Sequence, residues 1–356
     1  MTFDALLLAC FGGPEGVDDV VPFLERVTAG RGIPPERLLE VGQHYLTLGG
    51  VSPINAQNRA LAEALRAELS ARELDLPLYL GNRNSPPYFA DVLSEIHEDG
   101  HQRVLAIPTS AYSSYSGCRQ YREDLARALS QTQLNQVLAV EKISPVGDLP
   151  GFAEAMAPGL VDALAMVVEQ RGSLHGLHVF FTTHSIPDSM VAASGPQTGA
   201  STQQYVDQHL EVAADLMAAV AARFDPTPPW SLVYQSRSGP PTMPWLEPDI
   251  NDALRVAAAD GVASVVLVPI GFISDHIEVI WDLDTQARQT AAELGLDFTR
   301  VPTAGTSPPF VAGLVDVVEN AIKERSSTRG PLWTGLCSPE CCVNARAALD
   351  VVPGCS

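Results

Sequence analysis

The sequence predicts an α/β protein with two similar halves, each a doubly wound parallel sheet. Short apolar runs alternate along the 356 residues with amphipathic, alanine-rich stretches, and this alternation is typical of parallel sheets covered by helices. Three segments of the first half also recur, in the same order, in the second half. We therefore expect two Rossmann-like domains that face each other across a cleft, where α/β proteins bind ligands.

The apolar runs are predicted to be strands and the stretches between them helices. Strands are expected at 5–9, 78–80, 104–107, 137–140, 179–181, 232–234 and 265–268, and helical periodicity marks 58–74, 153–169, 203–224 and 249–260. We expect an N-terminal domain over 1–140, a C-terminal domain over 141–325 whose last helix can pack on the first domain, and a linker with a cysteine-rich segment over 326–356.

The internal repeat predicts two unlike walls for the cleft. The matched segments are 6–14 with 179–187, 81–87 with 235–241, and 104–108 with 265–269. Three residues of the first half then stand opposite protic residues of the second: Phe11 opposite His184, Tyr115 opposite His276, and Gly117 opposite Glu278. An apolar, aromatic wall that faces a protic one suits a flat aromatic ligand.

Composition and charge exclude several classes of protein. Asp and Glu outnumber Lys and Arg by 42 to 22, for a net charge of −20, and each phosphate contact needs a cation, so nucleic acid is disfavoured. The N-terminus lacks the basic region of a signal peptide. No apolar run is expected to reach the roughly 20 residues of a membrane helix. We expect a cytoplasmic protein with no integral membrane segment.

Polar residues at two predicted strand ends are the candidate catalytic groups. His184 follows the strand 179–181, and imidazole can accept a proton or bind a divalent metal near neutral pH; a bond to loop backbone is the alternative. If a helix begins at about Asp275, Glu278 and Asp282 share one of its faces and can carry a cation or protons. Each acidic residue also has an alternative role: Asp275 can cap the N-terminus of the helix, and Asp282 can lie on its solvent-exposed face.

Cysteines are concentrated at the end of the chain. Four of the six fall in the final twenty residues: Cys337, Cys341, Cys342 and Cys355. In a reducing compartment such a group indicates metal binding, and four thiols suffice for a 2Fe-2S cluster or a structural zinc. Adjacent cysteines strain a tetrahedral one-metal site, so the cluster is favoured over zinc, disulfides or idle thiols.

Together these motifs resemble the ferrochelatases, enzymes that insert ferrous iron into a porphyrin. The resemblance covers nearly the whole chain and depends on motifs in family order at 11–14, 49–53, 183–187, 235–237, 243–246 and 274–278. It implies the chelatase fold with the porphyrin between the domains. It also implies that His184 and Glu278 act where Fe²⁺, the metal substrate, enters the ring, with Asp282 as a relay behind Glu278.

Within the family, segment 23–50 is compact and charged, which favours the branch that metallates coproporphyrin III over the membrane-associated branch that metallates protoporphyrin. The expected reaction gives coproheme in haem biosynthesis. Protoporphyrin, another metal, and a carrier without turnover are the alternatives. The resemblance implies substrate contacts by five residues, of which Ser52 and Tyr121 meet propionates: Ser52, Tyr121, Phe11, Arg31 and Tyr45.

Three positions depart from the family pattern. Phe11 stands where some members of the coproporphyrin branch have tyrosine, and His44 where many have arginine. Several cluster-bearing members take one ligand from mid-chain, where this sequence has Pro158. All four ligands of a cluster are then expected in the tail, with Cys118 as the alternative fourth. Coproporphyrin III and Fe²⁺ are the expected partners, and transient contacts with neighbouring haem-pathway enzymes are compatible with the resemblance.

Overall fold

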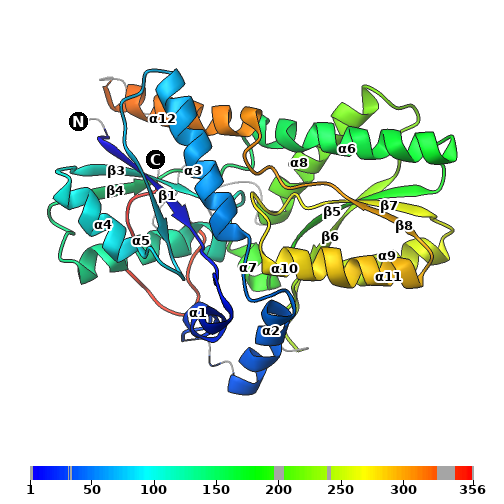
Figure 1. The fold of residues 1–356 in the computed structure, drawn as a ribbon, viewed down its shortest axis with the longest axis horizontal. Coiled ribbons are helices and arrows are strands. Elements are labelled where there is room, and N and C mark those ends of the chain that lie inside the picture. The colour runs from blue at the N-terminus through cyan, green and yellow to red at the C-terminus, as the bar shows by residue number, and fades with distance from the viewer. Residues whose placement is uncertain are drawn as a thin grey trace.

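The structure is a computed structural model that describes residues 3–30, 32, 34–195, 204–238, 242–326 and 341–354. Its described part contains two four-stranded parallel sheets, and helices flank both (Figure 1). The first sheet has the order β2-β1-β3-β4 and the second the order β6-β5-β7-β8. The two orders are the same permutation, so the predicted α/β fold and its repeat are confirmed.

The strands lie where the sequence predicts them, with small differences in length, and an eighth strand is added. In the first sheet they are β1 (Ala5–Cys10), β2 (Leu78–Asn82), β3 (Arg103–Pro108) and β4 (Ala139–Lys142). In the second they are β5 (Leu177–His184), β6 (Trp230–Gln235), β7 (Ser264–Val268) and β8 (Asp297–Arg300). β8 lies at a sheet edge and its residues are exposed or half-buried, which is why no apolar run marks it.

The register of the sheets corrects one of the three predicted pairings. Superposing Leu6 on Val179 brings β3 onto β7 as predicted, but it also brings Leu78 onto Trp230. Arg83 therefore corresponds to Gln235, and the pairing of 81–87 with 235–241 is wrong by two residues. The loops explain the error. Asn82 N–H donates to the carbonyl of Pro87, whereas Tyr234 N–H donates to that of Pro248 after a longer excursion.

The first-half helices are α1 (Val20–Val27), α2 (Pro35–Thr47), α3 (Ile54–Ala71), α4 (Phe89–Glu98) and α5 (Gln120–Gln131), with short η1 (Val17–Asp19) and the π-helical η2 (Tyr115–Arg119). The second-half helices are α6 (Pro150–Arg171), α7 (Asp188–Ala192), α8 (Gln204–Ala221), α9 (Ile250–Ala259), α10 (Ile277–Val279), the π-helical η3 (Ile280–Ala287), α11 (Arg288–Glu293) and α12 (Pro308–Ser326). Both halves thus carry a π-helical segment after their third strand.

One apolar core is shared by the two sheets. Along β1, Leu6 and Leu8 point to this core while Leu7 points to a separate cluster under α4 and α5, as the alternation of side chains along a strand requires. Side chains of β5, α6, α8 and α12 belong to the same shared core. The outer face of the second sheet packs on α9, η3 and α11. The halves are therefore joined by packing and not only by the chain.

Helix α6 corrects the expectation that no apolar segment reaches the length of a membrane helix. By length and composition it passes the test for a membrane-spanning helix, with a mean hydropathy of 1.5 over 18 residues. Core helices of soluble proteins pass the same test, and α6 packs against α8 and α12 with Phe152, Leu160 and Leu164 buried. The apolar run is broken by Pro158 and charged residues, which hid its length in the sequence.

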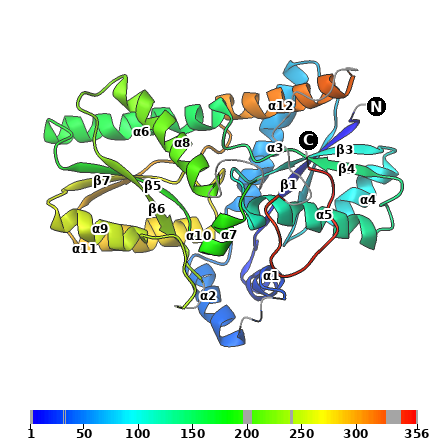
Figure 2. The same ribbon diagram turned by 180° about the vertical axis from the view of Figure 1, so that it is seen from behind.

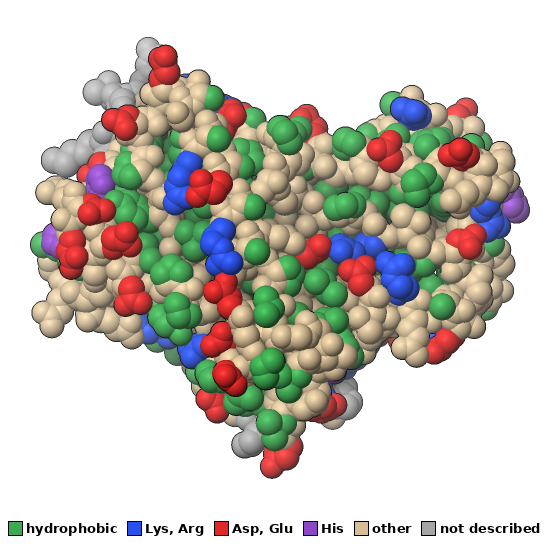
Figure 3. All heavy atoms as spheres, in the orientation of Figure 1, with side chains coloured by type: hydrophobic (Ala, Val, Ile, Leu, Met, Phe, Trp, Pro, Cys, Tyr) green, Lys and Arg blue, Asp and Glu red, His purple; other side chains and the backbone are tan. Residues whose placement is uncertain are grey.

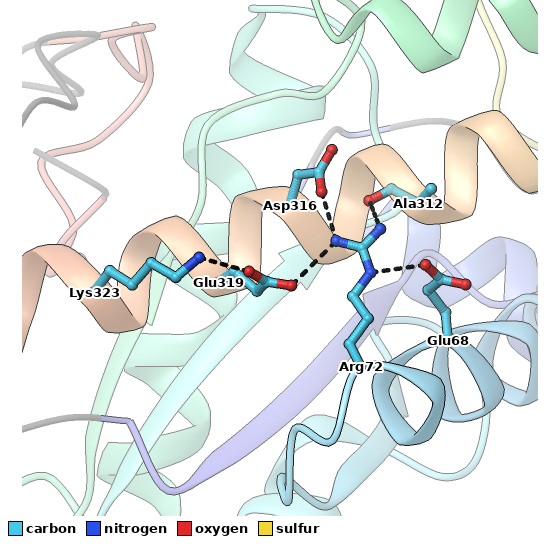
Figure 4. A network of polar contacts seen from close by, with 6 residues as sticks. All are labelled: Glu68, Arg72, Ala312, Asp316, Glu319 and Lys323. Atoms are coloured by element: carbon cyan, nitrogen blue, oxygen red, sulfur yellow. Dashed lines mark hydrogen bonds and ion pairs between the residues drawn. The ribbon is translucent and has the colours of Figure 1, made fainter.

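Helix α12 returns to the first half and lies against both α3 and α6. Its polar side is held by Arg72, at the end of α3 (Figure 4). The guanidinium donates to Glu68 at 2.7 Å, to Asp316 at 2.5 Å, to Glu319 at 3.2 Å and to the Ala312 carbonyl at 3.1 Å. The last helix is thereby tied to the first sheet's covering layer.

Candidate active site

His184 and Glu278 meet at the carboxyl ends of two strands in the second half. His184 ends β5, and Glu278 lies in α10, which follows β7. His184 Nε2 is 3.9 Å from Glu278 Oε2, and the two side chains are 34% and 41% exposed. His184 Nδ1 lies on the Ser185 carbonyl. A carbonyl can only accept, so Nδ1 carries the proton in the neutral ring and Nε2 presents its lone pair on the side of Glu278.

Asp282 lies behind this pair and is more deeply buried. Its carboxylate accepts from the Ser236 hydroxyl and, at 3.4 Å, from the Gln235 amide. Burial raises the pKa of Asp282 to about 6, and the neighbouring charge of Glu278 adds to the rise. Ser236 has a φ of 62°, an uncommon left-handed conformation for a residue with a side chain. This strained backbone indicates that the surrounding structure holds Ser236 in place against Asp282.

The helix that carries these carboxylates begins two residues later than predicted. It starts at Ile277 with His276 as the N-cap residue, and from Ile280 its turns are π-helical. Asp275 does not cap it. Instead both carboxylate oxygens of Asp275 accept from Arg300 of β8 at 3.0 Å, so the capping interpretation of Asp275 was wrong. π-Helical turns are uncommon and occur often at functional sites.

His276 is a further histidine beside the pair, and the repeat alone pointed to it. Burial and, as a smaller cause, the nearby charge of His184 lower the pKa of His276 to about 3. Its ring centroid lies 5.0 Å from that of Phe272 in an edge-on contact. His276 is therefore neutral, so any positive charge at this site falls on His184.

The first half contributes an aromatic group that reaches the acidic residues. Tyr45 of α2 packs in a cluster with Phe23, Phe11 and Ile277, the last from α10. Burial raises the pKa of Tyr45, and the charges of Glu278 and Asp282 raise it further. Through this cluster the first half reaches α10, the short helix that carries Glu278.

Three of the predicted substrate contacts are buried. Ser52, Tyr121 and Tyr45 are 4%, 3% and 5% exposed. The Tyr121 ring lies under the guanidinium of Arg83, 4.0 Å from ring centroid to Cζ, and Arg83 pairs with Asp124 at 2.6 Å. Sequence reasoning missed Arg83, although it fell inside a repeated segment. Of the other two predicted contacts, Phe11 is half-buried and Arg31 lies outside the described residues.

A ring stack that the sequence did not reveal joins the two halves beside this site. The His44 ring of α2 lies on Trp281 of η3, with ring centroids 4.2 Å apart and planes 10° from parallel. Two surface hollows, of about 850 and 310 Å³, lie instead along α3 and the edge strand β2. Neither is lined by His184, Glu278 or Asp282. The stack holds α2 of the first half against η3 of the second.

The cysteine segment is described in part. Cys337 and Cys355 lie outside the described residues. Cys341 and Cys342 are buried together with Cys118, a residue of η2. Over the described ranges, no group of three or more His, Cys, Asp or Glu side chains has the arrangement of a preformed metal site.

Comparison with known proteins agrees with this geometry. A protein-family model described as Ferrochelatase matches residues 3–322. The coproporphyrin III ferrochelatase of Streptomyces coelicolor is 52% identical over 364 residues, covering 99% of this chain and 96% of the relative. That of Leifsonia xyli is 49% identical, covering 97% and 92%. SirB from Bacillus subtilis, solved with Fe³⁺, has a TM-score of 0.53 at 10% identity, covering 92% of this chain and 98% of SirB, which shows the fold.

The twin sheets have the fold of the chelatases, and the family match and the relatives show that the protein is a metal chelatase. Within that class, the chain belongs to the ferrochelatase family.

Proposed function

We propose that this protein inserts Fe²⁺ into coproporphyrin III and gives coproheme, a step of haem biosynthesis. The observation that carries the proposal is the identity of about half of all residues, over nearly the whole chain, to relatives that bear this activity in their name. The second half supplies a histidine and a carboxylate 3.9 Å apart, which is the donor set that a proton-coupled metal insertion needs.

The reaction exchanges one Fe²⁺ for two pyrrole protons. His184 accepts a pyrrole proton at Nε2, and the Glu278 carboxylate stabilises the imidazolium that results. Glu278 also offers an oxygen ligand to the incoming Fe²⁺. Asp282, with its pKa near 6, can take up a proton from this pair and release it at neutral pH. The neutral His276 adds no competing charge.

Substrate recognition is assigned to the first half. Phe11 and Tyr45 provide the apolar wall for the macrocycle, and Ser52, Tyr121 and Arg31 are the proposed contacts for its carboxylates. Ser52, Tyr121 and Tyr45 are buried, so on this proposal binding includes an opening of the α1–α2 segment. Once the segment closes again over the macrocycle, the site can bend the ring. The binding energy used for this bending favours the transition state over the flat substrate.

We also propose that the tail carries a 2Fe-2S cluster with Cys337, Cys341, Cys342 and Cys355 as candidate ligands. The donor chemistry fits because Cys341 and Cys342 are buried side by side, with their sulfur atoms 3.7 Å apart. When bound, such a cluster stores one electron and cross-links the segments that hold it. A cytoplasmic location and transient contacts with neighbouring pathway enzymes complete the proposal.

The test is an anaerobic insertion assay with two porphyrins. We expect a higher kcat/KM for coproporphyrin III than for protoporphyrin IX, because the segment over the mouth is charged rather than apolar and two extra carboxylates give additional contacts. A preference for protoporphyrin IX, above all one enhanced by lipid vesicles, would reverse the choice of substrate.

The same assay tests the role of His184. His184→Ala should lose nearly all insertion while porphyrin still binds, because the imidazole acts on pyrrole protons and not on the propionates. His178→Ala is the matched control, since His178 is a half-buried histidine of the same strand. Activity of His184→Ala within about threefold of the native enzyme would remove the proposed proton acceptor.

A further inference from the structure

The last two residues of β5 are hydrogen-bonded to one buried tyrosine of α8. The hydroxyl oxygen of Tyr205 lies 2.9 Å from the carbonyl oxygen of His184 and 2.9 Å from the Thr183 hydroxyl. A carbonyl can only accept a hydrogen bond, so the single phenolic proton goes to His184, and the Thr183 hydroxyl donates to the Tyr205 oxygen. A side chain of a neighbouring helix is therefore bound to the main chain of the proposed proton acceptor.

Tyr205 is itself held in place by its surroundings. Figure 2 shows α8 between α6 and α7, and the N–H of Tyr205 donates to the Ser194 hydroxyl, in the loop after α7, at 3.0 Å. The ring centroid of Tyr205 lies 4.5 Å from that of His209 and 6.4 Å from that of Tyr112. Burial raises the pKa of Tyr205, so the phenol keeps its proton at neutral pH and remains a donor.

The end of β5 is also confined by the two strands beside it. Gly271, which follows β7, approaches so closely that a Cβ atom on this glycine would lie 2.7 Å from the Cα atom of Thr183. On the other side, the N–H of Ser185 donates to the carbonyl of Gln235, the last residue of β6, at 2.8 Å. The hydroxyl of Tyr205 adds the bond to the carbonyl between these two positions, that of His184.

This backbone sets the direction of the His184 ring. Nδ1 lies on the carbonyl of Ser185, so the orientation of the imidazole follows the main chain at 184–185. Nε2 is then 3.9 Å from Glu278 Oε2, while the His184 side chain is 34% exposed, which leaves the ring room to turn if the main chain shifts. Because misplacing a reacting group by about 1 Å can cost roughly a hundredfold in rate, a bond that fixes this backbone matters for catalysis.

We propose that Tyr205 is a positioning residue for metal insertion: its hydroxyl holds the His184 carbonyl so that Nε2 stays directed at the pyrrole nitrogens and beside Glu278. The inference rests on the proposed role of His184 as proton acceptor. Tyr205 acts through His184 and takes up no proton itself. The competing account is that Tyr205 only packs α8 on the second sheet, and in that case its hydroxyl affects stability but not the turnover of folded enzyme.

The test removes the hydroxyl and keeps the ring, by Tyr205→Phe in the full-length protein. Tyr112→Phe is the matched control, because the buried Tyr112 hydroxyl also donates to a main-chain carbonyl, that of Ile270 at 2.8 Å. Anaerobic insertion of Fe²⁺ into coproporphyrin III is measured. We expect kcat of Tyr205→Phe to fall about tenfold with KM for the porphyrin changed less than about twofold, and kcat of Tyr112→Phe to stay within about twofold of the native value. Equal kcat in the two variants would overturn the positioning role.

A spectroscopic readout separates positioning from a loss of stability. In protein labelled with nitrogen-15 histidine, the ring shifts report which nitrogen carries the proton, and comparison with His184→Ala assigns the signals of His184. We expect the Nδ1-protonated form in the native protein and in Tyr112→Phe, and a mixture of both forms in Tyr205→Phe. The native form alone in Tyr205→Phe would overturn the positioning role even if kcat fell.

The proposed function fails in a different way from this inference. Insertion that persists in His184→Ala would overturn the role of His184 and the inference that depends on it. Loss of insertion in His184→Ala, together with native kcat in Tyr205→Phe, would overturn the role of Tyr205 alone. Circular dichroism and porphyrin binding confirm that each variant is folded.

Discussion

Burial decides the protonation state of several single residues in this protein. His209 of α8 is fully buried, with its ring stacked 3.5 Å from that of Tyr112. Its Nδ1 donates to the Tyr205 carbonyl at 2.5 Å, and among the described residues its Nε2 has no hydrogen-bond partner. Burial lowers the pKa of His209 to about 3. The fold therefore requires the neutral imidazole.

This histidine should make the native state sensitive to acid. Its folded pKa lies below the unfolded value near 6.5, so its contribution to stability is complete above pH 6.5 and is lost as the pH falls from 6.5 towards 3. His209→Gln should remove this loss. Between pH 7 and pH 5 the free energy of unfolding should fall by about 2 kcal/mol more in the native protein than in the variant.

Urea unfolding at the two pH values measures the difference. His175→Gln is the control, because His175 is exposed in the loop before β5 and should leave the pH dependence of the native protein unchanged. An equal fall in His209→Gln and in the native protein would show that this imidazole does not titrate on unfolding.

Among the elements, α2 of the first half meets η3 of the second, and we expect this contact to open when the substrate binds. The His44–Trp281 stack joins α2 to η3, and the cluster of Tyr45 with Ile277 joins α2 to the adjoining α10. An aromatic stack of this kind stabilises the closed arrangement by about 0.5–1.5 kcal/mol. Only open molecules bind substrate, so the apparent affinity falls as the closed fraction grows. Breaking the stack should raise the open fraction and therefore speed binding.

We expect His44→Ala and Trp281→Leu to bind coproporphyrin III about two- to tenfold faster than the native enzyme, the factor that the stacking energy implies. Stopped-flow quenching of tryptophan fluorescence measures the association rate in His44→Ala, and absorbance of the porphyrin measures it in Trp281→Leu. His44→Phe keeps a stacked ring and should bind at nearly the native rate. Unchanged or slower association in both opening variants would show that α2 does not gate the mouth.

The sequence revealed those elements whose signal is local. The fully buried strand β1 reads as an unbroken apolar run, and His184 stands at a strand end where the fold brings polar residues together. What the sequence could not show depends on distant partners. The carboxylate of Asp275 accepts a hydrogen bond from Arg300, and α10 starts later than predicted. Cys118 packs with Cys342, which is more than 200 residues away in the sequence. The predicted pairing of 81–87 with 235–241 was wrong because the matched motifs do not show how long the loop after each strand is.

At the scale of the whole molecule, acidic residues outnumber basic ones by 42 to 22, and the face in Figure 3 shows both kinds scattered among neutral side chains. Arg72 joins Glu68 of α3 to Asp316 and Glu319 of α12. Its side chain is 23% exposed. The network therefore lies at the rim of the shared core, where α12 covers α3.

Arg72→Ala should lower the free energy of unfolding by roughly 1 kcal/mol, because one guanidinium serves three carboxylates and a carbonyl. Arg255→Ala is the control, since its pair with Asp252 is exposed on both sides and should contribute less than about 0.5 kcal/mol. Denaturant unfolding at low and high salt checks both, with the larger salt dependence expected in the native chain. Equal effects of the two substitutions would reduce the network to an ordinary surface pair.

The return of α12 and of residues 341–354 to the first half also sets an order of events on the ribosome. The first sheet and α3 are synthesised early, but the apolar face of α3 with Leu61, Leu65 and Leu69 shares a core with α12, which is made more than 200 residues later. At ordinary elongation rates of about 5–20 residues per second, that face stays uncovered for roughly 10 s or longer. A nascent chain stalled before α12 presents an unfinished apolar surface, and this is where a chaperone would bind.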